Sequence, residues 1–338
     1  MVPAFFFFAF LLPCGITLHQ KGKGTTDHFM VREIVMSGIR KAAVITGASS
    51  GIGYECVRRM SSAGWTVFAT VRKTSDRDRL RAERNVYPVI MDVQDASSIS
   101  AAAGEIASQL NGGGLDGLVN VAGIGMVRPL EYAPMSDVRE IFEINFFGQL
   151  ATIQAFCGML RKNRGRIINI TTVGVNLAIP FGGLLNASKS AFGKLSDTLR
   201  LELHRFGVQV IAVEPGSIST PAVDKTLGNI EEIIGSLPPE ARRNYGPMIR
   251  SVGRRGYAME KNGSAPDVVA VAVKHALTAD RPRLRYRVGK HATLLATLPK
   301  ILPESLFDSL IMRLLGMNES AKERPARAPS QARAMNPK

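Results

Sequence analysis

Short apolar runs that alternate with helix-like stretches constrain the fold of this chain more than any other feature. Runs rich in β-branched residues occupy positions 41–46, 65–71, 86–91, 115–121, 166–171, 208–214 and 285–288. Helical periodicity lies between them, for example over 96–110, 136–160 and 187–206. Apolar strands that alternate with helices predict a parallel sheet covered on both faces. We therefore expect an α/β fold, a doubly wound parallel sheet in one domain, with ligands at the carboxyl ends of the strands.

The two ends of the chain lack this alternation. Residues 3–12 include a run of phenylalanines, but a membrane-spanning helix needs roughly 20 apolar residues. We predict that residues 1–36 are a leader, either disordered or a mis-assigned start, with a membrane anchor as the alternative. The folded domain is expected over 37–290, followed by a helical extension over 291–317. Residues 318–338 are rich in Ala, Pro and Arg and are predicted to be a disordered basic tail.

The formal net charge of +15 is the notable feature of the composition. It suits an anionic partner such as nucleic acid, an acidic membrane or a phosphorylated ligand. Because the basic residues are scattered, without a stripe of interleaved aromatics, nucleic-acid binding is not predicted. The three cysteines and five histidines show neither a disulfide nor a metal-site spacing, so no metal is predicted. This cysteine usage favours a reducing, cytoplasmic location, with membrane association as the alternative.

A glycine-rich turn follows the first strand and opens a helix: positions 46–53 read Thr-Gly-Ala-Ser-Ser-Gly-Ile-Gly. Gly47 permits a tight turn, Gly51 permits backbone to approach a pyrophosphate, and Gly53 permits close packing of helix and strand. The helix N-terminus adds free N–H groups and a partial positive charge. Glycine also favours any tight turn, so the motif is weak evidence alone. In this context it predicts a Rossmann-type dinucleotide site.

Further segments in the right order make the chain resemble the short-chain dehydrogenase/reductase family. Asp92 ends the third strand, residues 120–123 read Asn-Val-Ala-Gly, Asn145 lies in a helix, and Lys189 ends an Asn-Ala-Ser-Lys run. Residues 215–221 match the family's Pro-Gly turn and threonine. The resemblance covers about residues 40–290, and the C-terminal extension is similar to that of the steroid- and retinol-oxidising branch. It implies an NAD(P)-dependent alcohol or ketone oxidoreductase that forms a homo-oligomer, either a dimer or a tetramer.

The family's functional residues are carried over position by position. The resemblance implies that Asn145, Thr172 and Lys189 are catalytic. The cofactor-binding residues that it implies are Gly47, Ser49, Ser50, Gly51, Ile52, Gly53, Arg72, Lys73, Asp92, Val93, Asn120, Ala122, Gly123, Lys189, Pro215, Gly216, Ile218 and Thr220.

The end of the second strand bears on the choice of cofactor. Enzymes that select NAD usually place a carboxylate there to hold the ribose hydroxyls. This chain has Arg72 and Lys73 instead. Arg72, helped by Lys73 or Ser50, could pair with a 2′-phosphate, so NADP(H) is favoured over NAD(H). The alternative is that both basic residues only begin a solvated loop.

One position departs from the family's pattern. The family uses a tyrosine as the acid and base, four residues before the lysine and on the same helix face. In this chain that position is Leu185, which has no proton to give. Thr172, thirteen residues earlier, stands where the family has a serine and keeps a hydroxyl. Loss of a positioned acid or base reduces the rate by about 10²–10⁴-fold.

Two classes of function therefore remain open. The first is an oxidoreductase, attenuated or with a proton donor supplied by Tyr132, Tyr245 or Tyr257, although each of these is more simply a packing or surface tyrosine. The second is a pseudoenzyme that binds dinucleotide and acts as a sensor or scaffold. Retention of Asn145, Lys189 and the cofactor turns suits both, because each of them also serves cofactor binding or helix packing.

Apolar residues beyond the Pro-Gly turn bear on the substrate. Ile230, Ile233, Ile234 and Leu237 could form one face of a substrate lid. The apolar pattern continues in the extension with Leu294, Leu295, Leu298, Ile301, Leu302, Leu306 and Phe307. Together with the resemblance, this predicts a small lipophilic alcohol or ketone as substrate. The alternatives are that these residues form core or dimer contacts, or that a basic-flanked C-terminal helix rests on a membrane as a peripheral contact.

Overall fold

A parallel sheet lies at the centre of the computed structural model, which describes residues 40–317. Its seven strands in these residues run in the order β3-β2-β1-β4-β5-β6-β7, and every neighbouring pair is parallel. The strands are β1 (Ala42–Ile45), β2 (Thr66–Val71), β3 (Val86–Ile90), β4 (Gly117–Asn120), β5 (Arg166–Ile170), β6 (Gln209–Pro215) and β7 (Arg285–Val288). The order reverses between β1 and β4, where a doubly wound sheet forms its ligand crevice. The predicted fold class is confirmed.

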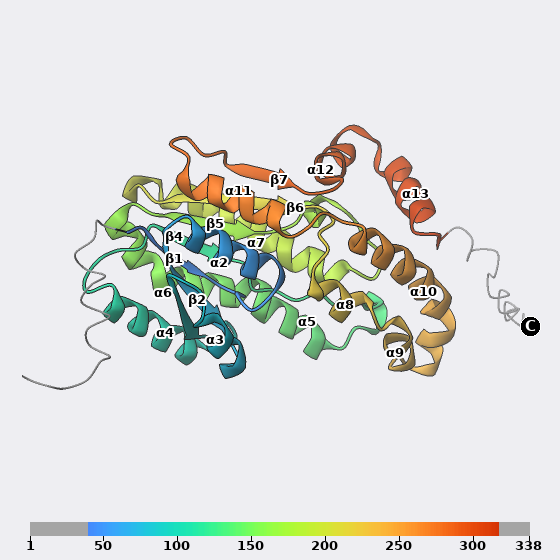
Figure 1. Ribbon diagram of the computed structural model, residues 1–338. Coiled ribbons are helices and arrows are strands. Elements are labelled where there is room, and N and C mark those ends of the chain that lie inside the picture. Colours follow the sequence, from blue (N-terminus) through green and yellow to red (C-terminus); the bar gives the residue numbers. More distant parts are fainter. Residues whose placement is uncertain (1–39, 318–338) are drawn as a thin grey trace, which may run out of the picture. The chain divides into compact units, whose positions relative to one another are not determined.

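Helices cover both faces of the sheet, as the continuous apolar strands require (Figure 1). On one face, α2 (Gly51–Ser62), α3 (Thr74–Leu80) and α11 (Asp267–Thr278) pack on a core that includes Ile45, Met60 and Val273. On the other, α4 (Ala96–Gln109), α6 (Gly148–Asn163) and α7 (Gly183–Glu202) pack on a core that includes Phe156 and Phe192.

The helix that we expected over 136–160 is interrupted by a π-helical turn. It consists of α5 (Met135–Phe142), the π turn Glu143–Phe147 and then α6. At the start of α6, a Cβ on Gly148 would lie 2.4 Å from the carbonyl oxygen of Val93, so glycine permits the helix to approach the end of β3. The π turn contains Asn145, and such turns often occur at functional sites.

The C-terminal third builds a separate apolar cluster from α8 (Pro221–Leu227), α9 (Ile230–Gly235), α10 (Pro239–Lys261), α12 (Ala292–Ile301) and α13 (Glu304–Leu314). Ile230, Ile234 and Leu237 are buried there together with Phe307. In contrast, Leu294, Ile301 and Leu306 of the extension are exposed. The sequence left open whether these apolar residues line a substrate lid, form core or dimer contacts, or rest on a membrane. Ile230, Ile234 and Leu237 form core contacts.

Among residues 40–317, no helix has the length and apolar content needed to cross a bilayer. The phenylalanine-rich leader and the basic tail both lie outside the described residues.

Candidate active site

The glycine-rich turn between β1 and α2 is tightly closed. Gly47 and Gly51 have φ of 62° and 54°, the left-handed region that glycine adopts most readily. A Cβ on Gly53 would lie 2.1 Å from the carbonyl oxygen of Gly47, closer than real atoms approach. The roles predicted for Gly47 and Gly53, a tight turn and close packing, therefore match the geometry.

The start of α2 offers donors for an anionic ligand. The first N–H groups of any helix have no partner within it, and the N-cap residue Ser50 makes no side-chain capping bond to them. Ser50 is exposed and the first turn of the helix contains no acidic residue. This end of the helix therefore fits a pyrophosphate, which the helix dipole also favours.

The end of β4 lies directly against the turn. A Cβ on Gly47 would lie 3.0 Å from the Cα of Ala122. Thr46 Oγ1 accepts hydrogen bonds from the backbone N–H of Val121 at 2.9 Å and of Ala122 at 3.1 Å. The sequence interpretation missed Thr46, although its place immediately before the turn was a signal. These two hydrogen bonds join the start of the glycine turn to the end of β4.

Asn120, at the end of β4, has its side chain inside the protein. It is 1% exposed, and its amide donates to Asn169 Oδ1 at 2.9 Å. Asn169 in turn donates to Ser196 Oγ at 2.8 Å. Asn120 therefore links β4, β5 and α7, and only its backbone lies at the strand end beside Ala122.

The turn after β6 also lies close to the glycine turn. A Cβ on Gly51 would lie 3.2 Å from the Cβ of Thr220. Gly216 lies close to the chain beyond β7, because a Cβ there would lie 2.3 Å from the carbonyl oxygen of Lys290. Pro215 and Ile218 are buried. The fold thus brings residues 51 and 220, far apart in sequence, into contact.

The ends of β2 and β3 carry the residues predicted to recognise the adenosine half. Arg72 and Lys73 are exposed after β2, and Asp92 is half-buried, with Oδ1 accepting from the N–H of Gln94 at 3.0 Å. Arg79, which the sequence interpretation missed, donates from α3 to the carbonyl oxygen of Ser49 at 2.6 Å. It brings a second guanidinium to the glycine turn.

Lys189 and Asn145 lie beside Gly123. A Cβ on Gly123 would lie 3.1 Å from Asn145 Oδ1 and 3.2 Å from Lys189 Nζ. Asn145 Oδ1 accepts from the N–H of Ile124 at 2.9 Å, and its amide donates to the carbonyl oxygen of Ile124 at 3.0 Å and to Ser188 Oγ at 3.0 Å. The π turn, α7 and the segment after β4 therefore meet at one point.

Lys189 is buried, and its Nζ donates to the carbonyl oxygen of Ile170 at 2.9 Å. Burial lowers the pKa of this amine to about 8. With such a pKa, a larger fraction of the amine is neutral near pH 7 than in an ordinary lysine.

Thr172 and Leu185 are the remaining residues that the sequence predicted at the reaction site. Thr172 Oγ1 accepts from the N–H of Gly174 at 3.0 Å, which leaves its O–H free to donate elsewhere. Leu185 is half-buried in the first turn of α7, and its Cδ2 would lie 3.6 Å from a Cβ on Gly125. Its side chain therefore faces the segment that follows β4.

The candidate replacement tyrosines are bonded elsewhere. Tyr245 donates to Glu131 Oε2 at 2.5 Å and Tyr257 donates to Asp224 Oδ1 at 2.8 Å. Each carboxylate raises the pKa of the phenol that it binds. The ring of Tyr132 packs edge-on against Tyr245, with centroids 6.0 Å apart. In this arrangement all three belong to the α8–α10 region rather than to the Lys189 cluster.

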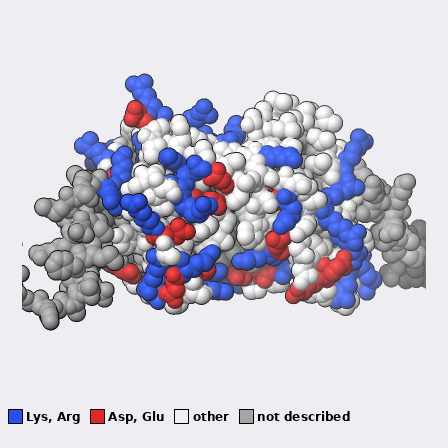
Figure 2. Space-filling view, in the orientation of Figure 1, with Lys and Arg blue, Asp and Glu red and all other residues white. Residues whose placement is uncertain are grey.

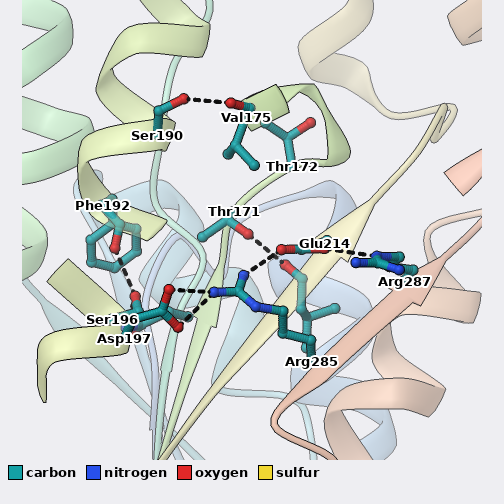
Figure 3. Close-up of polar contacts among 12 residues, drawn as sticks. Thr171, Thr172, Val175, Ser190, Phe192, Ser196, Asp197, Glu214, Arg285 and Arg287 are labelled. Atoms are coloured by element: carbon teal, nitrogen blue, oxygen red, sulfur yellow. Dashed lines mark hydrogen bonds and ion pairs between the residues drawn. The ribbon is translucent and has the colours of Figure 1, made fainter. Parts of the chain in front are cut away.

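A buried carboxylate supports the turn after β6 (Figure 3). Glu214 is 2% exposed and accepts from Arg285 at 2.5 Å and Arg287 at 3.2 Å, both on β7. Arg285 also donates to both carboxylate oxygens of Asp197 on α7 at 2.6 Å. The alternation of Arg285 and Arg287 in the last strand was the available signal, because residues two apart share a face of a strand.

Comparisons with known proteins agree with this geometry. Residues 41–230 match the family model described as short chain dehydrogenase. Rat 17-beta-hydroxysteroid dehydrogenase type 6 is 32% identical, over 83% of this chain and 90% of its own. Human retinol dehydrogenase 5 is also 32% identical, over 80% and 87%. A short chain dehydrogenase from Burkholderia cenocepacia, solved in complex with NADP, superposes with a TM-score of 0.62 at 25% identity and covers 80% of this chain and 97% of its own.

Proposed function

The chain belongs to the short-chain dehydrogenase family, and on that premise we propose that it is an NADP(H)-dependent oxidoreductase of lipophilic alcohols or ketones, slowed by Leu185. One observation carries the proposal: Lys189 and Asn145 lie on the same face of Gly123, between β4 and α7. A buried amine whose pKa is lowered to about 8, at the carboxyl end of β4, supports proton transfer to and from a bound alcohol or ketone. The proposed catalytic residues are Asn145, Thr172 and Lys189.

NADP(H) is the proposed cofactor, and when bound it supplies or accepts the hydride. Gly47, Gly51, Gly53 and the uncapped start of α2 fit its pyrophosphate, as described above. The exposed Arg72, with no carboxylate at the end of β2, supports the preference for a 2′-phosphate. The other cofactor residues carried over from the family remain part of this proposal.

A lipophilic substrate is supported by the two relatives whose names specify steroid and retinol substrates. The apolar cluster of α8–α10 and α13 lies beyond the turn at Thr220, where it would form the wall of a substrate site. We also propose the domain limits 37–290 and 291–317, and a homo-oligomer on family grounds.

A peripheral membrane contact through α12 and α13 is a further part of the proposal. Leu294, Ile301, Leu306, Leu310 and Leu314 are exposed on these helices. Figure 2 shows mostly uncharged atoms over α12, with basic side chains beside them. An apolar face flanked by basic residues suits an interface with anionic lipid. Flotation with phosphatidylserine vesicles tests it, and Leu306→Ser with Leu310→Ser should weaken binding. Equal flotation of the variant would contradict the contact.

A dinucleotide-binding pseudoenzyme is the second candidate. The observation that favours it is that Tyr245 and Tyr257 are bonded to carboxylates and Tyr132 packs against Tyr245, so none of the three candidate tyrosines is bonded at Lys189. The first candidate predicts slow native turnover, and the second predicts none.

The deciding experiment measures NADPH oxidation by the full chain with a panel of lipophilic ketones and aldehydes. Leu185→Tyr restores the missing phenol and should raise kcat by about 10²–10⁴-fold. Leu185→Phe supplies the same ring without a hydroxyl and is the matched control. Native turnover above that of a Lys189→Met variant supports the oxidoreductase. Activity in Leu185→Tyr alone favours the pseudoenzyme.

A further inference from the structure

The amine of Lys189 lies where three segments of the candidate site meet. It bonds the carbonyl oxygen of Ile170, two residues before Thr172, at 2.9 Å. It lies 3.2 Å from where a Cβ on Gly123 would be, and Asn145 Oδ1 lies 3.1 Å from that same position. The amine is therefore held by the carbonyl of Ile170 on β5, the strand that leads to Thr172, and it lies on the same side of Gly123 as Asn145 Oδ1.

Leu185 stands one helical turn before Lys189 on the same face of α7. A leucine side chain ends well short of the place that the phenol oxygen of a tyrosine would reach from this backbone. In a family member with tyrosine, that phenol stands between the amine and the reacting oxygen. In this chain the side chain at position 185 has neither the length nor the proton for that role.

We propose that Lys189 itself supplies and takes back the proton of the reaction, through one water molecule that bridges its Nζ and the substrate oxygen beside Thr172. This inference rests on the proposed function, because it assigns the proton source of the same oxidoreductase. Lys189 then exchanges the proton of the reaction itself, rather than lowering the pKa of a tyrosine.

The proton and electrons balance as follows in ketone reduction. The carbonyl carbon gains the hydride that the reduced dinucleotide supplies, and the π electrons of the carbonyl bond move to its oxygen. That oxygen takes a proton from the water while the water takes one from the Lys189 ammonium. The neutral amine regains a proton from solvent. The Thr172 hydroxyl donates a hydrogen bond to the oxygen and is unchanged. Alcohol oxidation is the reverse.

The groups that surround Lys189 carry no charge. They are the carbonyl of Ile170 on β5, the amide of Asn145 in the π turn, the backbone at Gly123 and the ring of Phe192, whose centroid is 5.9 Å from Nζ. Burial alone lowers the pKa of the amine to about 8, with no contribution from a charged side chain among the described residues. The titration of the relay is therefore expected to be that of one isolated amine.

The test compares two measurements on the full chain. The first is the pH dependence of kcat with saturating NADPH and ketone. The second is the pKa of Lys189, measured by NMR with isotope-labelled lysine and assigned with Lys189→Met. We expect kcat for reduction to fall tenfold per pH unit above the pKa that NMR reports, because reduction needs the ammonium form. The oxidation rate should rise through the same pKa, because oxidation needs the neutral amine.

Variants provide the controls. Lys189→Met should lower kcat by at least about 10²-fold, and Lys194→Met, at an exposed lysine of the same helix, should not change it. Leu185→Tyr should raise kcat and uncouple its pH dependence from Lys189. If the native kcat does not change with pH around the pKa of Lys189, the proposed proton relay is wrong, but the proposed oxidoreductase function is not affected. Turnover in Leu185→Tyr only would overturn the proposed function, and the relay with it.

Discussion

The dinucleotide crevice and the start of α7 differ in how far they keep the family's pattern. In the crevice, the glycines at 47, 51 and 53 are retained, and two of them would meet backbone if they carried a Cβ. At the start of α7, Lys189 matches the family's lysine by resemblance, and Leu185 stands at the position that the same resemblance assigns to the proton donor. The backbone requires glycine at positions 47 and 53, whereas Leu185 is half-buried in the first turn of α7.

Asn145 and Lys189, which we propose to be catalytic, resemble the glycines in having a structural role. Asn145 bonds both backbone groups of Ile124, and Lys189 bonds Ile170. These residues hold segments together, so their presence alone does not establish activity. Asn145 and Lys189 therefore have structural contacts besides the catalytic roles that we propose, so the test of activity depends on position 185.

The largest effect on stability is expected for Asn145→Ala. It leaves the N–H and carbonyl of half-buried Ile124 without their side-chain partner, and an unpaired group costs up to about 1–3 kcal/mol when it is fully buried. Urea unfolding should show the loss, while Gln109→Ala, at an exposed amide on α4, should change stability little. If Asn145→Ala unfolds at the same urea concentration as the native chain, Asn145 does not stabilise the fold.

The next effect is a pH dependence of stability that comes from Lys189. Its pKa in the folded chain is about 8, lower than in the unfolded chain, so the buried charge costs stability below that pH. Stability should rise from pH about 8 towards the ordinary lysine pKa, by at most roughly 1.4 kcal/mol per pH unit. Urea unfolding across this range should show the slope, and Lys189→Met should remove it. A slope that survives in Lys189→Met would contradict the assignment.

Gly53→Ala tests the crevice. The added methyl meets the carbonyl of Gly47, and such overpacking costs about 1–3 kcal/mol. Dinucleotide affinity, measured by calorimetry, should fall with it because the turn must open. Gly104→Ala, in α4 with nothing near its Cβ, should instead stabilise the chain by about 0.5–1 kcal/mol. Unchanged affinity in Gly53→Ala would show that the turn is not the phosphate site.

The effect confined to one dinucleotide is expected at Arg72, after the end of β2. Arg72→Ala should weaken NADPH binding by about 10- to 100-fold, since a hydrogen bond to a charged group contributes about 1.5–3 kcal/mol. Binding of NADH should stay nearly the same, because it has no 2′-phosphate. Arg84→Ala, an exposed arginine before β3, is the control. Equal losses for both dinucleotides would refute the cofactor preference.

The sequence by itself determined the strands, their parallel arrangement and the glycine turn. Continuous apolar runs indicate strands buried on both faces, and the spaced glycines indicate a left-handed turn, so both are visible among neighbouring residues. Its resemblance to the family also assigned roles to Lys189, Asn145, Thr172 and position 185, and these roles stay predictions. The interruption of the long helix by a π turn was not visible in its periodicity.

Only the tertiary structure decided which partner each polar or apolar side chain finds. It turned Asn120 inward to Asn169, joined Glu214 to Arg285, and bonded Tyr245 to Glu131. It also buried Ile230 against the C-terminal helices rather than leaving that face open. These partners lie far apart in the chain, and the pKa of Lys189 depends on the same long-range burial. A pattern of neighbours cannot specify contacts that form only when distant segments pack together.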